Sequence, residues 1–424
     1  MLATKAMAEQ VQLDVALGTP TMLAGQKQTT YLRVAMTGMD VKDMGRRAPV
    51  NVAFVIDKSG SMSGEKIQKA KEAMRMAIEK LRDDDIVSVV AYDSFVQVLV
   101  PATRLTDRNA VYAAFEGLTA NNSTALFAGV SKGAAELRKF FDRERVNRII
   151  LLSDGLANVG PSSPAELGEL GTSLGREGIS VTTIGLGLDY NEDLMTKLAL
   201  RSDGNHMFAE RAEDLAQAFA REFGDVLTVA AQNVTLQINC SGGVRPVRVL
   251  GREADIVGQT VRTALNQLYG QQTKYLILEV EVPAGTLGSE MTVASVDVSY
   301  QNMAAGAPET LQRTVAASFT DSPAIVEANT KKDVMAAAAY QVGVERNILA
   351  TRLRDEGKIE EARQVLISNT RFLDENAKKF DDTALQSYGY SNRAAAENLD
   401  DTKWVKQRKL MRMEQHEIIT QQSK

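Results

Sequence analysis

Cysteine and histidine are scarce in this sequence, which has one cysteine, Cys240, and two histidines among 424 residues. A single thiol excludes an internal disulfide framework and any zinc site built from several thiolates. Two histidines leave little imidazole for catalysis or metal binding. Cys240 continues the alternation of Val234, Leu236 and Ile238. We therefore expect a buried, apolar-like side chain at this position rather than a reactive thiol.

Long apolar runs are also missing, since the longest candidates, such as residues 50–56 and 149–152, have the length of strands. No transmembrane helix is therefore predicted. Ala6-Met7-Ala8 matches the small-residue pattern before a signal-peptidase cut, although no apolar stretch precedes it. We expect an exported protein, periplasmic or at the cell surface, whose signal peptide is absent from this chain. A cytoplasmic location is the alternative.

Excess positive charge is the third absence. Lys plus Arg number 49 against 54 Asp plus Glu, and the net charge of −5 argues against a nucleic-acid partner. With 44% hydrophobic and 24% charged residues, the composition is that of a soluble globular protein, and the length predicts about three domains. No feature of the sequence specifies an oligomeric state.

Signatures of enzymes are not found either. No G-x-x-x-x-G-K-[ST] loop occurs, and Gly185-Leu186-Gly187 begins like a dinucleotide loop but has Tyr190 where the third glycine belongs. His206 has Asp203 nearby, but no serine or cysteine nucleophile accompanies it in the sequence. We therefore expect no enzymatic activity.

Residues 48–227 alternate strand and helix patterns. The apolar run 50–56 predicts a strand buried on both faces, and residues 65–82 repeat apolar side chains at helical spacing. Strand and helix patterns continue to about residue 225, with one hairpin at 86–100. This alternation predicts a doubly wound, Rossmann-like α/β domain with a mostly parallel sheet.

The flanking segments have a different pattern. Residues 9–47 and 228–320 alternate apolar and polar side chains, which predicts strands with one buried face. The first segment is too short to be stable alone, so we expect both to form one discontinuous β-sandwich in which the α/β domain is inserted. Residues 324–424 predict a helical C-terminal region.

The C-terminal stretch 402–413 is basic and contains the single tryptophan, Trp404. One interpretation is a contact with an anionic surface or partner. The other, which we favour, is a solvated helix with one packed tryptophan.

Oxygen-bearing side chains follow two predicted strands and precede one predicted helix in the α/β domain. They occur in Asp57-Lys58-Ser59-Gly60-Ser61, in Asn122-Ser123-Thr124 and in Ser153-Asp154-Gly155. In an open α/β sheet, ligands bind at the carboxyl ends of the strands, so we expect these loops to converge. Hydroxyl and carboxylate oxygens are the ligands that hard divalent cations prefer.

This set resembles the metal-ion-dependent adhesion site of von Willebrand factor type A domains, with D-x-S-x-S at Asp57, Ser59 and Ser61, then Thr124, then Asp154. The resemblance implies that Mg²⁺, or else Mn²⁺ or Ca²⁺, is coordinated directly by Ser59 and Ser61. It implies direct coordination by Thr124 in the ligand-bound arrangement and contact with the two aspartates largely through water. A partner protein would supply an Asp or Glu to the open position.

The resemblance extends over nearly the whole chain to bacterial proteins named calcium-activated chloride channel homologues and, more distantly, to inter-alpha-trypsin-inhibitor heavy chains. The sequence departs from many relatives at Asn122-Ser123, where they have Gly-Gly or Gly-Ser. Without these glycines the loop is expected to be less flexible, which affects how the Thr124 loop would switch but not the presence of its threonine.

Partner choice is expected to depend on residues around the centre. This rim consists of Met62, Ser63, Asn158, Asp189 and Tyr190. The leading hypothesis is a non-enzymatic, metal-dependent protein-binding module of adhesion or scaffold type. The alternatives are a cytoplasmic accessory protein of a AAA+ ATPase, of chelatase or MoxR type, and a structural envelope protein whose metal stabilises the fold.

Overall fold

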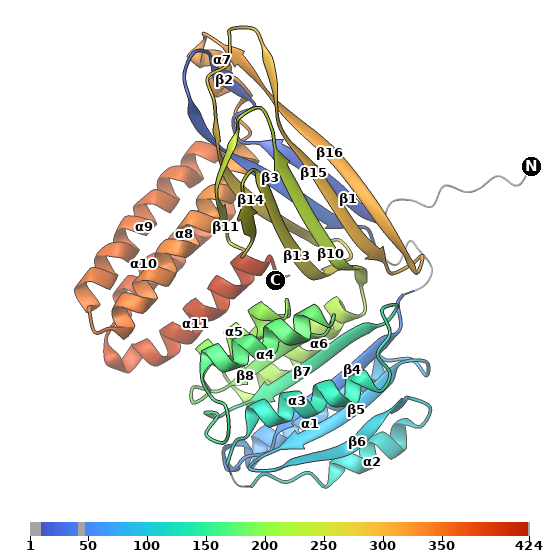
Figure 1. The fold of residues 1–424 in the computed structure, drawn as a ribbon. Helices are drawn as coiled ribbons and strands as arrows, with labels where there is room; N and C mark the ends of the chain where they lie inside the picture. Colours follow the sequence, from blue (N-terminus) through green and yellow to red (C-terminus); the bar gives the residue numbers. More distant parts are fainter. Residues whose placement is uncertain (1–9, 41–46, 122, 423–424) are drawn as a thin grey trace, which may run out of the picture. The chain divides into compact units, whose positions relative to one another are not determined.

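The computed structural model describes residues 10–40, 47–121 and 123–422 (Figure 1). The chain forms two compact units, one of residues 1–41 with 230–400 and the other of residues 42–229 with 401–424. The expected helical region 324–424 is divided between them at residue 400, for the reason given below.

The α/β unit contains a six-stranded sheet in the order β6-β5-β4-β7-β8-β9, with all pairs parallel except β5–β6. This confirms the predicted doubly wound domain and its single hairpin. The strands are β4 (Val50–Asp57), β5 (Ile86–Tyr92), β6 (Val96–Arg104), β7 (Val146–Ser153), β8 (Ser180–Leu186) and β9 (His206–Ala209).

Helices cover both faces of this sheet. Ala53 and Val55 of β4 join a buried cluster with residues of α3, α4 and α5, whereas Phe54 points the other way and stacks on Phe219 and Phe223 of α6. Burial on both faces is why β4 is apolar throughout. The helices are α1 (Glu65–Glu79), α2 (Arg108–Glu116), α3 (Leu126–Arg138), α4 (Pro164–Arg176), α5 (Glu192–Arg201) and α6 (Leu215–Val226).

Helix α11 (Asp401–Thr420) packs against α5 and β9 of the same unit. Lys409 donates to the Tyr190 carbonyl at 2.8 Å and to Glu192 Oε2 at 2.6 Å, and Arg412 pairs with Asp193 at 2.7 Å. Trp404 is packed, as the favoured interpretation predicts. The basic stretch is nevertheless not a solvated helix, because Lys409 is buried and Arg412 is paired. Its cations neutralise the acidic first turn of α5, a match across more than 200 residues that local periodicity does not reveal.

The other unit is a β-sandwich, as predicted, built from segments on both sides of the α/β insertion. One sheet has the order β1-β3-β14-β11 and the second β12-β13-β10-β15-β16-β2. The strands are β1 (Val11–Leu17), β2 (Thr21–Leu23), β3 (Gln28–Gly38), β10 (Val229–Cys240), β11 (Arg245–Leu250), β12 (Asp255–Val257), β13 (Thr260–Tyr269), β14 (Thr273–Val282), β15 (Glu290–Asn302) and β16 (Ala307–Thr320).

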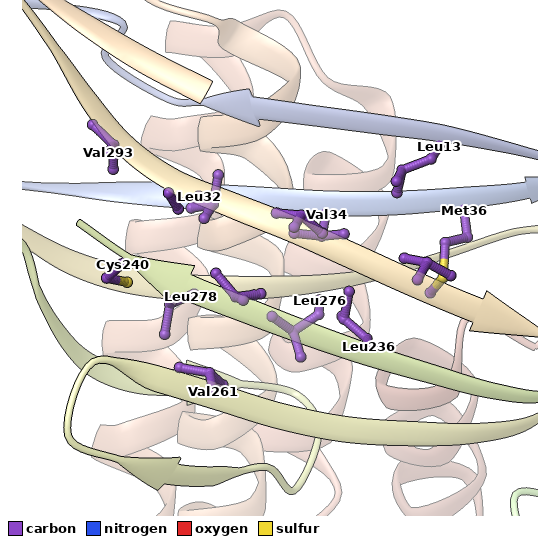
Figure 2. Close-up of a cluster of buried hydrophobic side chains, with 14 of the residues drawn as sticks. Leu13, Leu32, Val34, Met36, Leu236, Cys240, Val261, Leu276, Leu278 and Val293 are labelled. Carbon is purple, nitrogen blue, oxygen red and sulfur yellow. The ribbon is translucent and has the colours of Figure 1, made fainter. Parts of the chain in front are cut away.

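Alternate residues of these strands fill the space between the sheets. Figure 2 shows Leu13 and Val34 from one sheet with Leu236 and Val261 from the other among the side chains of this core. Cys240 is buried here too, and burial raises the pKa of its thiol to about 11. The expectation of an inert thiol is thereby supported.

The sandwich unit also carries α7 to α10, which form the part of the predicted helical region up to residue 400. Asn347 and Asn369 both donate to Asn392 Oδ1 at 2.9 Å, which ties α8, α9 and α10 together in their buried interior. The helices are α7 (Pro323–Asn329), α8 (Lys332–Asp355), α9 (Ile359–Phe380) and α10 (Thr383–Glu397). Across the described residues, no helix is long and apolar enough to cross a membrane.

Candidate metal centre

Two buried aspartates lie at neighbouring strand ends. Asp57 is the last residue of β4, and Asp154 follows directly after β7. The two strands are parallel neighbours with Ile56 opposite Leu152, so both carboxylates emerge at the carboxyl edge of the sheet. Both side chains are fully buried. The predicted convergence of these two strand ends is therefore what the fold produces.

The Asp57 carboxylate is held by hydrogen bonds on both oxygens. Oδ1 accepts from the Ser59 amide at 2.8 Å and Oδ2 accepts from Ser153 Oγ at 2.6 Å. Burial nevertheless raises the pKa of Asp57 to about 6; the two serines oppose the rise and the charge of Asp154 adds to it. A nearby cation would favour the ionised form.

Three hydroxyls surround a point beside Gly155. A methyl group on Gly155 would lie 3.3 Å from Ser61 Oγ, 3.5 Å from Thr124 Oγ1 and 3.9 Å from Ser59 Oγ. Ser61 Oγ also lies 3.1 Å from Ser59 Oγ and donates to Asp154 Oδ1 at 2.6 Å. A side chain at position 155 would crowd this space. Its glycine leaves room for an ion among oxygen ligands, and the residues present therefore fit a hard divalent cation.

The Thr124 loop is braced by Asn158. The Thr124 amide donates to Asn158 Oδ1 at 2.8 Å, and the Asn158 amide donates back to the Thr124 carbonyl at 3.1 Å. Asn158 is exposed, as a rim residue should be, but its side chain supports the loop. Asn122, where the sequence departs from the family pattern, lies outside the described residues.

Two lysines that we did not predict complete the centre. Lys66, in the first turn of α1, pairs with Asp154 Oδ2, and Lys58 pairs with the buried Asp93. The signal was present in the sequence, because Lys58 lies inside the motif and Lys66 lies at the start of the helix that follows it. Nothing in the residue spacing, however, indicated which carboxylate each ammonium group meets.

Two of the five expected rim residues are not on the surface. Met62 is fully buried beneath the turn, and Tyr190 packs its ring over Gly185, where a methyl group would lie 2.2 Å from Cζ. Large apolar side chains next to a strand end gain more from the core than from solvent. Ser63 and Asp189 are exposed and are compatible with a rim.

The candidate centre depends on hydroxyl ligands as well as carboxylates. In the part of the chain that the structure describes, no group of three or more His, Cys, Asp or Glu side chains is arranged to hold a metal. His206 is buried, with Nδ1 2.8 Å from Thr183 Oγ1. This placement agrees with a packed histidine.

Known proteins resemble this chain in sequence over different lengths. The protein sll0103 of Synechocystis sp. is 26% identical over 308 residues, which cover 70% of this chain and 72% of its own. Human inter-alpha-trypsin inhibitor heavy chain H3 is 32% identical over 177 residues, 38% of this chain and 19% of its own. The Arabidopsis thaliana protein WAV3, named an E3 ubiquitin-protein ligase, is 28% identical over 306 residues. Those residues cover 68% of this chain and 39% of WAV3.

A solved structure shares the fold. The von Willebrand factor type A protein from Catenulispora acidiphila superposes with a TM-score of 0.70, with 89% of each chain covered at 19% sequence identity. Residues 51–222 match the family model of the von Willebrand factor type A domain. The resemblance inferred from Asp57, Ser59, Ser61, Thr124 and Asp154 is therefore confirmed for residues 51–222, which form a von Willebrand factor type A domain.

Proposed function

We propose that this protein is a metal-dependent protein-binding module. Domains of this type commonly mediate protein–protein interactions and are mostly not enzymes. Five residues would hold a divalent cation, Mg²⁺ in the first place and Mn²⁺ or Ca²⁺ as alternatives: Asp57, Ser59, Ser61, Thr124 and Asp154. The observation that carries the proposal is that three hydroxyls meet beside Gly155 and one of them donates to the buried Asp154, while the buried Asp57 ends the neighbouring strand.

The chemistry of these oxygens leads to the kind of partner. The hydroxyls of Ser59, Ser61 and Thr124 are neutral ligands, and the carboxylates of Asp57 and Asp154 are already hydrogen-bonded to neighbouring groups. Such a set does not supply the six ligands that Mg²⁺ requires. When bound, the cation would offer an open position to an anionic oxygen, which an Asp or Glu of another protein supplies.

A binding role fits the rest of the domain better than catalysis. The only histidine of residues 51–222 is His206, which is buried and engaged with Thr183. Thr183 is fully buried as well, so this hydroxyl–imidazole pair is closed to a substrate and does not serve covalent catalysis. Similarity to the ligase WAV3 covers 39% of that protein, so we do not carry its activity over.

Metal binding is tested by chemical unfolding of the wild type in EDTA, Mg²⁺, Mn²⁺ and Ca²⁺. At about 100 times its Kd, an ion should raise the free energy of unfolding by about 2.7 kcal/mol. Ser61→Ala should lose this gain, whereas Ser63→Ala, on an exposed hydroxyl two residues away, should keep it. An equal gain in both variants would contradict the proposed site.

Partner binding is tested separately by capturing proteins from the native source on immobilised wild type in Mg²⁺ and in EDTA. A partner that is released by EDTA and lost with Ser61→Ala supports the module. Stabilisation by the ion without any EDTA-sensitive partner would favour the structural role of the metal instead.

A further inference from the structure

Four large apolar side chains are exposed on the loops around the candidate metal centre. Their exposed fractions are 76% for Phe95, 59% for Leu156, 39% for Leu188 and 36% for Val159. Phe95 lies in the β5–β6 turn, Leu156 and Val159 follow β7, and Leu188 follows β8. Because β5, β7 and β8 are parallel to β4, their loops leave the same edge of the sheet as Asp57.

Hydrogen bonds connect two of these positions to the centre, and a third is close to it in the sequence. The Phe95 amide donates to Asp93 Oδ1 at 2.8 Å, and the other oxygen of Asp93 pairs with Lys58, the neighbour of Asp57. The Val159 amide donates to the Thr124 carbonyl at 3.2 Å. Leu156 is two residues from Asp154.

Leu188 is placed by its neighbour. Gly187, which precedes it, lies beside Lys66, because a methyl group on that glycine would be 3.8 Å from Nζ. Lys66 in turn pairs with Asp154. Single exposed apolar residues are common on proteins, but four on three adjoining loops at one site are typical of an interaction surface.

The turn that carries Phe95 is held in place. Its buried neighbour Asp93 accepts from the Ala125 amide at 2.7 Å through the main-chain carbonyl, and Ser94 Oγ accepts from the Ser123 amide at 3.2 Å. The loop is thus anchored to the loop of Thr124. A large apolar side chain on an ordered loop loses little conformational entropy on binding, which is a property of binding hot spots.

Charge at the centre limits what can bind there. The charged groups that pair within it are the carboxylates of Asp57, Asp93 and Asp154 and the ammonium groups of Lys58 and Lys66. Three negative and two positive charges give −1, and a divalent cation changes the sum to +1. One carboxylate from a partner would neutralise the loaded centre.

We propose that Phe95, Leu156, Val159 and Leu188, termed the apolar rim, select a protein segment in which the metal-binding acidic residue is flanked by large apolar side chains. The proposal rests on the proposed function for the contact between metal and acid. The rim adds the specificity that a lone carboxylate lacks, since burial of flanking leucine or phenylalanine side chains is favourable. The occupant is a peptide segment of another protein.

The test uses three labelled peptides, with one glutamate between two leucines, one glutamate between two serines, and one glutamine between two leucines. Binding to the full chain is measured by fluorescence anisotropy in Mg²⁺ and in EDTA. The leucine-flanked acid should bind the wild type about tenfold tighter than the serine-flanked one. Phe95→Ser should abolish that preference and leave the Mg²⁺ affinity unchanged. Phe141 is an exposed aromatic residue after α3, and Phe141→Ser is the matched control that should keep the preference for the leucine-flanked peptide.

The outcomes separate the rim from the metal contact. Equal affinity of the two acidic peptides, a preference that survives Phe95→Ser, or binding of neither at about 1 mM would overturn the apolar rim. A leucine preference that depends on Phe95 but persists in EDTA would uphold the rim and overturn the metal contact. Equal affinity of the leucine-flanked glutamine and glutamate peptides would have the same meaning. A wild-type dimer in Mg²⁺ that dissociates with Phe95→Ser would assign the rim to a second copy and overturn the proposal.

Discussion

The imidazole rings of His206 and His416 meet edge to face, with their centroids 6.0 Å apart. They are the two histidines of the sequence, separated by more than 200 residues, and both are buried. His206 begins β9 at the edge of the sheet, and His416 belongs to α11, where its Nε2 lies 3.0 Å from the Gly204 carbonyl. The side chain of Gln422 accepts from the His206 amide at 3.0 Å and donates to its carbonyl at 3.2 Å. The C-terminal segment thus protects an otherwise unpaired strand edge.

This histidine pair predicts that His206 contributes less to stability in mild acid than at neutral pH. Burial, with added repulsion from His416 and Lys409, holds the pKa of His206 well below its usual range. Thr183 and Tyr190 are the other groups that face its ring. The unfolded chain takes up a proton below about pH 6.5 while folded His206 does not, so the contribution of His206 to the free energy of unfolding should fall as the pH drops below about 6.5. Asp57, whose pKa is raised to about 6 in the folded state, acts in the opposite direction, and equally so in the wild type and in a His206 variant.

The slope of that fall is at most about 1.4 kcal/mol per pH unit for one group. Urea unfolding in EDTA between about pH 7.5 and about pH 5.5 measures it. His206→Phe removes the proton uptake and should give a smaller decline than the wild type. The same decline in both proteins would rule out His206 as the source.

The buried lysine of α11 should be essential for stability. Lys409→Met leaves Glu192 with Arg408 as its partner, and we expect a loss of about 3 kcal/mol in the free energy of unfolding. Adding Glu192→Gln should recover part of the loss. Lys406→Met, which removes an exposed pair with Glu210 on the same helix, should cost less than about 1 kcal/mol. Equal effects of the two lysine variants in urea unfolding would argue against a buried anchor.

Gly185 should not accept a side chain. A methyl group there would overlap the Tyr190 ring, so Gly185→Ala should lower the free energy of unfolding by about 1–3 kcal/mol through overpacking. Tyr190→Leu in the same chain should relieve part of that strain. The comparison is Gly117→Ala, at the end of α2 with φ −76° and open space around it, which should be close to neutral. Thermal melts that show equal loss in both glycine variants would contradict this packing.

Asn158 should act on metal affinity from outside the ligand set. Asn158→Ala removes the acceptor for the Thr124 amide, and a lost hydrogen bond of this kind is worth about 1 kcal/mol. Isothermal titration with Mn²⁺ should therefore show an affinity roughly fivefold weaker, with the free energy of unfolding in EDTA little changed. Unaltered affinity would mean that the loop does not need this brace.

Much of the architecture was determined by the sequence alone. Local periodicity predicted the main elements. The all-apolar run predicted the buried strand β4, the helical spacing after it predicted α1, and the strict alternation of the flanking segments predicted the strands of the sandwich. The places of Asp57 and Asp154 at the ends of two strands were sufficient to predict that their loops meet, because parallel strands have their carboxyl ends at one edge. Thr124 was expected there from its place before a helix. Ser59 and Ser61 were expected near the same edge, because they follow Asp57 at intervals of two residues.

Only the tertiary structure decided where side chains turn and which distant segments meet. Met62 and Tyr190 looked exposed from their position in loops, yet burial of their apolar surface outweighs solvent contact. The docking of α11 depends on complementary charges on Lys409 and Glu192, which are separated by 217 residues. Periodicity describes one element at a time, so pairings between elements follow from how their faces fit and not from the pattern of either one.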